Sequence, residues 1–229
     1  MNRRFKILGI GMVLIGVSFL LAGGYSFLKV QEGYRSLAAF SAAQNVTLSY
    51  NEAGQLVDGG ETAGAEEIMT LLTEDWGYAV NPADFDPNDP IVNTASEYMY
   101  EMATISSHVL HGTQTIVLEE PVEYNGETFA AGEHEFAVDG RYYADFNRSH
   151  PLEGPARGLA WSPTALALIG QLGVGTMTHS SLQMGLGLAA AFGAIGVTLL
   201  ILGGGLVWAV RPEAEQVPVA RPVIAPTAA

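Results

Sequence analysis

The sequence predicts an α+β membrane protein with two transmembrane helices and a small extracytoplasmic domain that combines helices with antiparallel β-hairpins. Three observations predict this class. Residues 7–28 and 158–210 contain no charged side chain, and each run exceeds the roughly 20 residues that cross a bilayer. The chain between them is polar and rich in turn-forming residues. Residues 29–157 also hold 22 of the 24 acidic residues but only 5 of the 10 basic ones.

Composition excludes several classes of protein. The chain has no cysteine, which excludes disulfides, thiolate metal sites and a cysteine nucleophile. Its formal net charge is −14, and so acidic a body repels the phosphates of nucleic acids and anionic lipids. Cations or basic protein surfaces suit it better as partners, beside the bilayer itself.

The first apolar run, residues 7–28, is predicted to be a transmembrane helix. The three basic residues within residues 1–6 indicate a cytoplasmic N-terminus. A cleaved signal peptide has the same parts, including the small residues 22–24, and remains the alternative. The length of the run favours an uncleaved span, because signal-peptide cores are usually about 7–15 residues.

The last apolar run is predicted to form one helix that begins near Pro163. From there to residue 210 a helix would measure about 70 Å at roughly 1.5 Å per residue, more than twice the hydrocarbon core. We therefore predict an extracytoplasmic stalk over residues 163–181 and a second span over residues 182–210. A polar stripe on the stalk indicates partial cover by protein: Thr164, Gln171 and Thr178.

A three-span arrangement is the alternative for this end of the chain. Residues 163–177 would cross the bilayer and residues 178–181 would form a turn, which puts the C-terminus outside. Fifteen helical residues cover only about 22 Å, which is short of the bilayer core. The tail, residues 211–229, has four prolines and is predicted to be disordered and cytoplasmic.

Small residues recur at regular spacing in both predicted spans. Such seams let helices approach closely in membranes, although glycine is also simply common there. The predicted helix-packing residues, every seven in the first span and every four in the second, are Gly9, Gly16, Gly23, Gly185, Ala189 and Gly193.

The acidic domain, residues 29–162, is predicted to begin with short elements. Helical spacing indicates that the first span continues over residues 31–44, followed by a strand at 46–50, a turn at 58–60 and a helix at 63–72. Residues 81–90 carry three prolines and form a loop. Its oxygen ligands are candidates for an irregular calcium site, although the EF-hand pattern is not met: Asp84, Asp86, Asn88 and Asp89.

A capping box predicts the next helix. Thr94 is the expected N-cap and Glu97 the residue that returns the hydrogen bond, and the helix should end at His111 before Gly112. Its expected core stripe is Tyr98, Met102, Ile105 and Val109. The other predicted face carries Glu97, Glu101, Thr104, His108 and His111.

Residues 114–146 are predicted to be a meander of three or four antiparallel strands. Its two turn signals are Asn125-Gly126 and Asp139-Gly140. The first places Val122 opposite Phe129. The second would place Phe136 opposite Tyr143 and His134 opposite Asp145. Residues 150–155 are expected to be a connector.

No motif for catalysis or phosphate binding occurs, and we assign no catalytic residue and no cofactor. The histidines on the helix face are candidates for a metal site, against the simpler interpretation of a solvated helix end. The candidate metal ligands are Glu101, His108, His111 and His134, with His150 as another possible member.

The basic first span, the strand at 46–50, the extracytoplasmic helical insert and the Ser-, Thr- and Gly-rich last helix together resemble an uncharacterised family of small two-span actinobacterial membrane proteins. Some members of that family are labelled ring-opening dioxygenases. The resemblance is architectural and assigns no functional residue. The sequence shows no ligand set for dioxygenase chemistry.

The function expected from the sequence is interaction or scaffolding at the cell membrane, with both termini in the cytoplasm. The protein would be an accessory subunit of a membrane complex, or a homo-oligomer, held by its small-residue seams and its acidic domain. Binding is favoured over catalysis. The alternative is an extracytoplasmic metal- or small-solute-binding protein, or a metal-dependent enzyme, that uses the His108 and His111 region.

Overall fold

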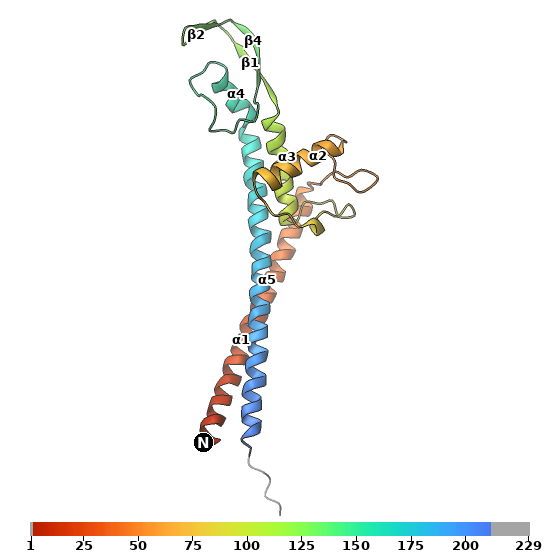
Figure 1. Ribbon diagram of the computed structural model, residues 1–229, viewed down its shortest axis with the longest axis vertical. Coiled ribbons are helices and arrows are strands. Elements are labelled where there is room, and N and C mark those ends of the chain that lie inside the picture. Colours follow the sequence, from red (N-terminus) through yellow and green to blue (C-terminus); the bar gives the residue numbers. More distant parts are fainter. Residues whose placement is uncertain (1, 212–229) are drawn as a thin grey trace, which may run out of the picture. The chain divides into compact units, whose positions relative to one another are not determined.

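The computed structural model describes residues 2–211, and within them it is an α+β structure with five α-helices and two small antiparallel sheets (Figure 1). The predicted α+β class is thereby confirmed. The α-helices are α1 (Asn2–Gln44), α2 (Thr62–Thr70), α3 (Ala95–Leu110), α4 (Glu153–Ala160) and α5 (Pro163–Ala209). The strands are β1 (Thr113–Leu118), β2 (Val122–Tyr124), β3 (Glu127–Phe129) and β4 (Gly132–Ala137). The predicted tail lies outside the described residues beyond Arg211.

Both α1 and α5 are long and apolar enough to cross a membrane. The chain divides into two compact units. The first contains the described residues up to Leu28 and from Gly185 on, and the second is Lys29–Met184. Because α5 runs without a break from Pro163 to Ala209, the turn at residues 178–181 that a three-span arrangement requires is absent.

The first unit is an antiparallel pair of helix segments whose glycines meet. A Cβ added to Gly9 would lie 2.7 Å from the carbonyl oxygen of Gly203, so the two backbones are nearly in contact. The same holds at Gly16 and Gly196, where the distance would be 2.9 Å. The third crossing places Gly23 beside Ala189 and Gly193, and close by the rings of Phe19 and Phe192 pack edge to face at 5.6 Å. Five of the six predicted seam residues thus pack within one chain.

The second unit has two apolar cores. The first lies where α2 and α3 pack with parts of α1 and α5: Leu37, Leu48, Ala65, Ile68, Leu72, Val92, Tyr98, Tyr100, Ala103 and Leu172. The second joins the end of α3 to the strands and α4: Leu110, Ile116, Val138, Phe146, Ala156, Ala160 and Trp161. Helix α1 reaches Gln44, as its spacing predicts, and ends where Asn45 adopts a left-handed φ of 50°.

The capping box of α3 is present as predicted. The Thr94 hydroxyl accepts from the Glu97 N–H at 3.3 Å, and the Glu97 carboxylate accepts from the Thr94 N–H at 2.8 Å. Glu97, which was predicted to lie on the face opposite the core stripe, is fully buried. The predicted core stripe is also displaced. Of its four residues only Tyr98 is buried, and the buried face instead centres on Tyr100 and Ala103.

The strand predicted at residues 46–50 does not form. Isolated bridges join Thr47 to Ile91 and Tyr50 to Leu56, since this segment pairs with two different stretches and has no continuous partner. The helix predicted at residues 63–72 is present as α2, and it continues as a π-helical turn, Leu71–Asp75.

The prediction of a meander is wrong about which strands pair around the hairpin of β2 and β3. Strand β1 pairs with β4, which places His134 opposite Ile116 and Phe136 opposite Gln114, not opposite Asp145 and Tyr143. The short hairpin of β2 and β3 has the predicted turn and the pairing of Val122 with Phe129.

The turn at Asp139-Gly140 has the expected left-handed backbone but another role. The Gly140 N–H donates to the carbonyl of Leu110 at 2.9 Å, so the turn caps the end of α3 instead of starting a hairpin.

Helix α4 replaces part of the predicted connector at residues 150–155. Its Pro155 lies in the first turn, where a helix needs no N–H donor. The Nδ1 atom of His150 accepts from the N–H groups of Leu152 and Glu153 at 3.2 and 3.3 Å. A histidine thus takes the capping role that Asp or Ser usually has.

Candidate functional site

The predicted metal ligands are not brought together. His108 Nε2 contacts Asp58 Oδ2 at 2.8 Å, His111 Nδ1 donates to the Ser107 carbonyl at 3.0 Å, and His134 Nε2 donates to the Ala130 carbonyl at 2.8 Å. His150 packs between the rings of Tyr124 and Phe129. Across residues 2–211, no group of three or more His, Asp or Glu side chains is placed to hold a metal ion.

The candidate calcium residues of the acidic loop interact with their neighbours. Asp86 Oδ1 accepts from the backbone and side-chain N–H groups of Asn88 at 2.9 and 2.8 Å. Asp84 accepts from Asn81 at 2.7 Å and Asp89 from Asn93 at 3.3 Å. Local turn formation therefore accounts for the asparagine and aspartate content of this loop.

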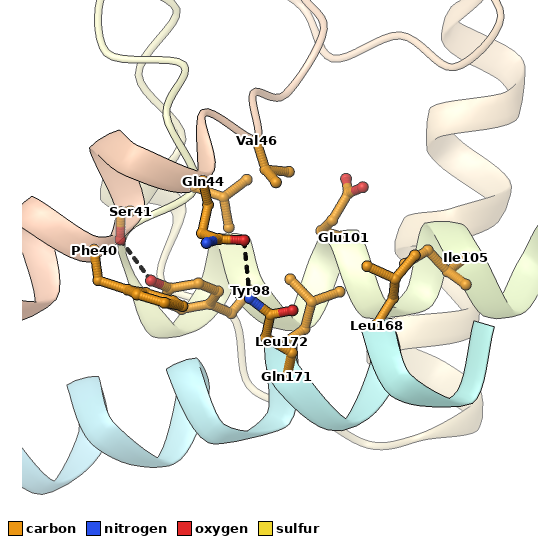
Figure 2. Close-up of a pocket in the computed structure, with 11 residues that line it drawn as sticks. Phe40, Ser41, Gln44, Val46, Tyr98, Glu101, Ile105, Leu168, Gln171 and Leu172 are labelled. Carbon is orange, nitrogen blue, oxygen red and sulfur yellow. Dashed lines mark hydrogen bonds between the residues drawn. The ribbon is translucent and has the colours of Figure 1, made fainter. Parts of the chain in front are cut away.

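A cavity of about 190 Å³ lies between α1, α3 and α5 in the second unit (Figure 2). Its walls are mainly apolar, with polar side chains contributed by all three helices. The residues that line it are Phe40, Ser41, Gln44, Val46, Val92, Tyr98, Glu101, Ile105, Leu168, Gln171 and Leu172.

Two hydrogen bonds between helices fix the polar side of this cavity (Figure 2). Ser41 Oγ and Tyr98 Oη are 2.6 Å apart, and Ser41 also donates to the Leu37 carbonyl at 3.0 Å. The serine hydrogen is thus used, so the Tyr98 hydroxyl donates to Ser41. The Gln171 side-chain N–H donates to Gln44 Oε1 at 3.0 Å, which leaves the Gln171 amide oxygen as an acceptor.

Glu101 is the charged residue of the cavity. Burial is the main cause that raises its pKa, the charge of His108 lowers the pKa in part, and the charge of Asp58 has a smaller raising effect. Within residues 2–211 its carboxylate accepts no hydrogen bond. Glu101 also borders a second hollow, lined by Asp58 and Tyr100 among others.

Tyr100 has a buried hydroxyl without a partner in the described part of the chain. The residue is 3% exposed, and burial together with the neighbouring acids raises the pKa of its phenol. An unpaired buried hydroxyl costs about 1–3 kcal/mol, so native proteins usually satisfy it.

The outward face of α5 in the second unit is apolar and exposed. Met177 is 72% and Met184 74% exposed, and Val174 flanks them. The residues along this face are spaced four, three, four, three and four apart: Leu166, Gly170, Gly173, Met177, Ser180 and Met184. We call them the α5 outer face. A Cβ at Gly170 or Gly173 would meet nothing within 4 Å.

The opposite face of α5 is the covered one, so this part of α5 is partly covered by protein. Thr164, Gln171 and Thr178 are exposed, whereas Leu172, Thr176 and His179 are buried. His179 Nδ1 accepts from the Ala95 N–H at the start of α3 at 3.2 Å. A Cβ at Gly175 would collide with the Tyr98 ring at 2.7 Å, so this glycine was the sequence signal for the contact of α5 with α3.

Comparison of the chain with protein-family models, with curated proteins and with solved structures gives no match. The resemblance to the small actinobacterial membrane proteins therefore remains an expectation from the sequence.

Proposed function

We propose that this protein is a membrane-anchored, extracytoplasmic interaction protein that associates with a second copy of itself through the α5 outer face. In this proposal residues 7–28 and 182–210 span the cell membrane, both termini are cytoplasmic, and the acidic domain is outside. The observation that carries the proposal is an uncharged face with 4-3-4-3-4 spacing, five of whose six residues are exposed, opposite the buried side of α5.

The neighbours of α5 support a location of this face outside the hydrocarbon core. Gly33 of α1 packs against Leu182, and the rings of Tyr34 and His179 meet edge to face at 5.7 Å. This part of α1 carries the ion pair of Lys29 with Glu32, whose atoms are 2.6 Å apart. Charged side chains are costly in lipid, so the α5 outer face as far as Ser180 belongs above it, and Met184 lies at the start of the proposed span.

Water contact at the α5 outer face is unfavourable, which gives association its driving force. Burying an exposed methionine contributes about 1.5–3 kcal/mol, and each copy offers Met177 above the proposed span. Alternating spacings of four and three residues are those of paired helices, and glycines let the two backbones approach.

A second copy is the partner that fits this face best. Two copies inserted in the same direction hold identical residues at the same height above the membrane. The two uncharged α5 outer faces can then pack together without bringing the strongly acidic surfaces of the two domains into contact.

Single cysteines test the proposal directly, because the natural chain has none. Met177→Cys places a thiol on the α5 outer face, and Thr178→Cys places one on the adjacent exposed residue about 100° around the helix. In mild detergent or nanodiscs, we expect oxidation to link the Met177→Cys variant into dimers and to leave the Thr178→Cys variant unlinked.

Light scattering should give the mass of a dimer for the unmodified protein. A monomeric mass together with equal or absent linking at both positions would refute self-association. Linking of the Met177→Cys variant to a different membrane protein in cells would also refute it, and would indicate an accessory subunit instead.

A further inference from the structure

We propose that the cavity between α1, α3 and α5 binds a small organic cation, an ammonium group carried on a compact apolar body, with Glu101 as its carboxylate partner. This inference does not depend on self-association, because the cavity and the α5 outer face lie on different sides of α5.

The size of the cavity limits the apolar body of the ligand. Its volume is about 190 Å³, and an apolar cavity of about 150 Å³ is known to hold benzene. Val46, Ile105, Leu168 and Leu172 provide apolar walls around it. A single six-membered ring or a branched alkyl group of similar size therefore fits.

The charge of the cavity selects a cation. The Glu101 carboxylate accepts no hydrogen bond from any residue in 2–211, so both of its oxygens are open to donors from a ligand. Nearby Asp58 adds negative potential, although Asp58 itself is paired with His108 at 2.8 Å. An ammonium ligand would supply hydrogen-bond donors to this carboxylate and a second positive charge beside that of His108.

Glu101 also borders the hollow that contains Tyr100, but the buried Tyr100 hydroxyl is not part of the cavity lining and forms no part of the proposed site. An ammonium group carries three N–H donors, and the Glu101 carboxylate can accept from them. A metal ion is less suitable, because residues 2–211 bring no three acidic or histidine ligands together.

Calorimetric titration of the full-length protein with three ligands of nearly equal shape tests the charge requirement. Benzylamine is cationic, benzyl alcohol is neutral and benzoate is anionic. We expect benzylamine to bind at least tenfold more tightly than benzyl alcohol, and benzoate not to bind.

Three variants locate the site. Glu101→Gln should weaken benzylamine at least tenfold and leave benzyl alcohol unchanged. Glu119→Gln removes an exposed carboxylate elsewhere and should change neither. Leu168→Trp, at a position that is 44% exposed and lines the cavity, should fill it and abolish binding of both ligands.

Equal affinity of the unmodified protein for benzylamine and benzyl alcohol would overturn the proposal, as would an absence of benzylamine binding at millimolar concentration. Unchanged benzylamine affinity in folded Glu101→Gln would overturn it too. Circular dichroism verifies that each variant is folded. If Glu101→Gln fails to fold, the ligand series on the unmodified protein and the Leu168→Trp variant decide the question.

Discussion

Replacement of Gly16 by alanine tests how closely α1 and α5 pack in the first unit. The added Cβ would lie 2.9 Å from the carbonyl oxygen of Gly196 and 3.1 Å from the Cβ of Leu199. Carbon atoms in proteins pack at about 3.5–4.0 Å, so the two helices must separate by roughly 0.5 Å to accept the methyl group.

The cost of this separation can be worked out approximately. A gap of about 0.5–1 Å forfeits roughly a quarter to a half of the dispersion energy of the contacts that it opens. Extra methyl groups in packed sites cost about 1–3 kcal/mol, whereas the higher helix propensity of alanine returns up to about 1 kcal/mol. We expect Gly16→Ala to lower the free energy of unfolding by about 1–2 kcal/mol.

Gly24→Ala is the matched control on the same helix. Its added Cβ would meet nothing within 4 Å, so it gains helix propensity without forcing the helices apart. Unfolding of the full-length protein by increasing SDS in mixed micelles, followed by circular dichroism, gives both values. If Gly16→Ala is as stable as Gly24→Ala, the close contact of the two helices is refuted.

Three further predictions concern the second unit. Thr94→Ala removes the N-cap of α3 and should cost about 1 kcal/mol in urea unfolding, with no loss refuting the cap. Ser41→Ala leaves the buried Tyr98 hydroxyl without its acceptor and should cost about 1–3 kcal/mol; Tyr98→Phe in the same chain should recover part of this, and strictly additive losses would exclude coupling. Burial raises the pKa of Glu101, so its stabilising contribution is complete below the ordinary value of 4.5 and is lost as the pH rises through the raised pKa. The stability of Glu101→Gln relative to the unmodified protein should therefore increase when the pH is raised from about 4 to about 7.5. The same stability difference between the two proteins at both pH values would contradict this.

Local signals in the sequence predicted the helices well. The absence of charge in residues 158–210 and the start signal at Pro163 gave α5 nearly residue for residue, and Thr94 with Glu97 gave the start of α3. These helices could be predicted without knowledge of the fold, because they depend on hydrogen bonds and apolar periodicity within one short stretch of the chain.

The strand pairings could not be predicted in this way. The turn at Asp139-Gly140 has the left-handed backbone that its residues indicate, yet the residue that it bonds is Leu110 of α3. A turn signal gives the local dihedral angles and contains no information about the distant partner. Pairing of β4 with β1 is decided by the second core, where Ile116 is buried.

The cavity could not be predicted from the sequence either. Ser41, Tyr98 and Leu172 come from three helices and meet only in the folded chain. Glu101 was singled out in the sequence, but for a histidine cluster that does not form. The buried face of α5 could not be predicted either, because the missing side chain at Gly175 and the polar contact of His179 decide which side faces α3.

The crossing of Gly9 with Gly203 has a practical consequence for engineering. Because the two helix segments run in opposite directions, Asn2 and Arg211 leave the first unit at the same end. Complementary fragments of a split fluorescent protein, one fused ahead of Asn2 and the other behind Arg211, should reassemble on a single polypeptide and report its integrity in living cells by their emission.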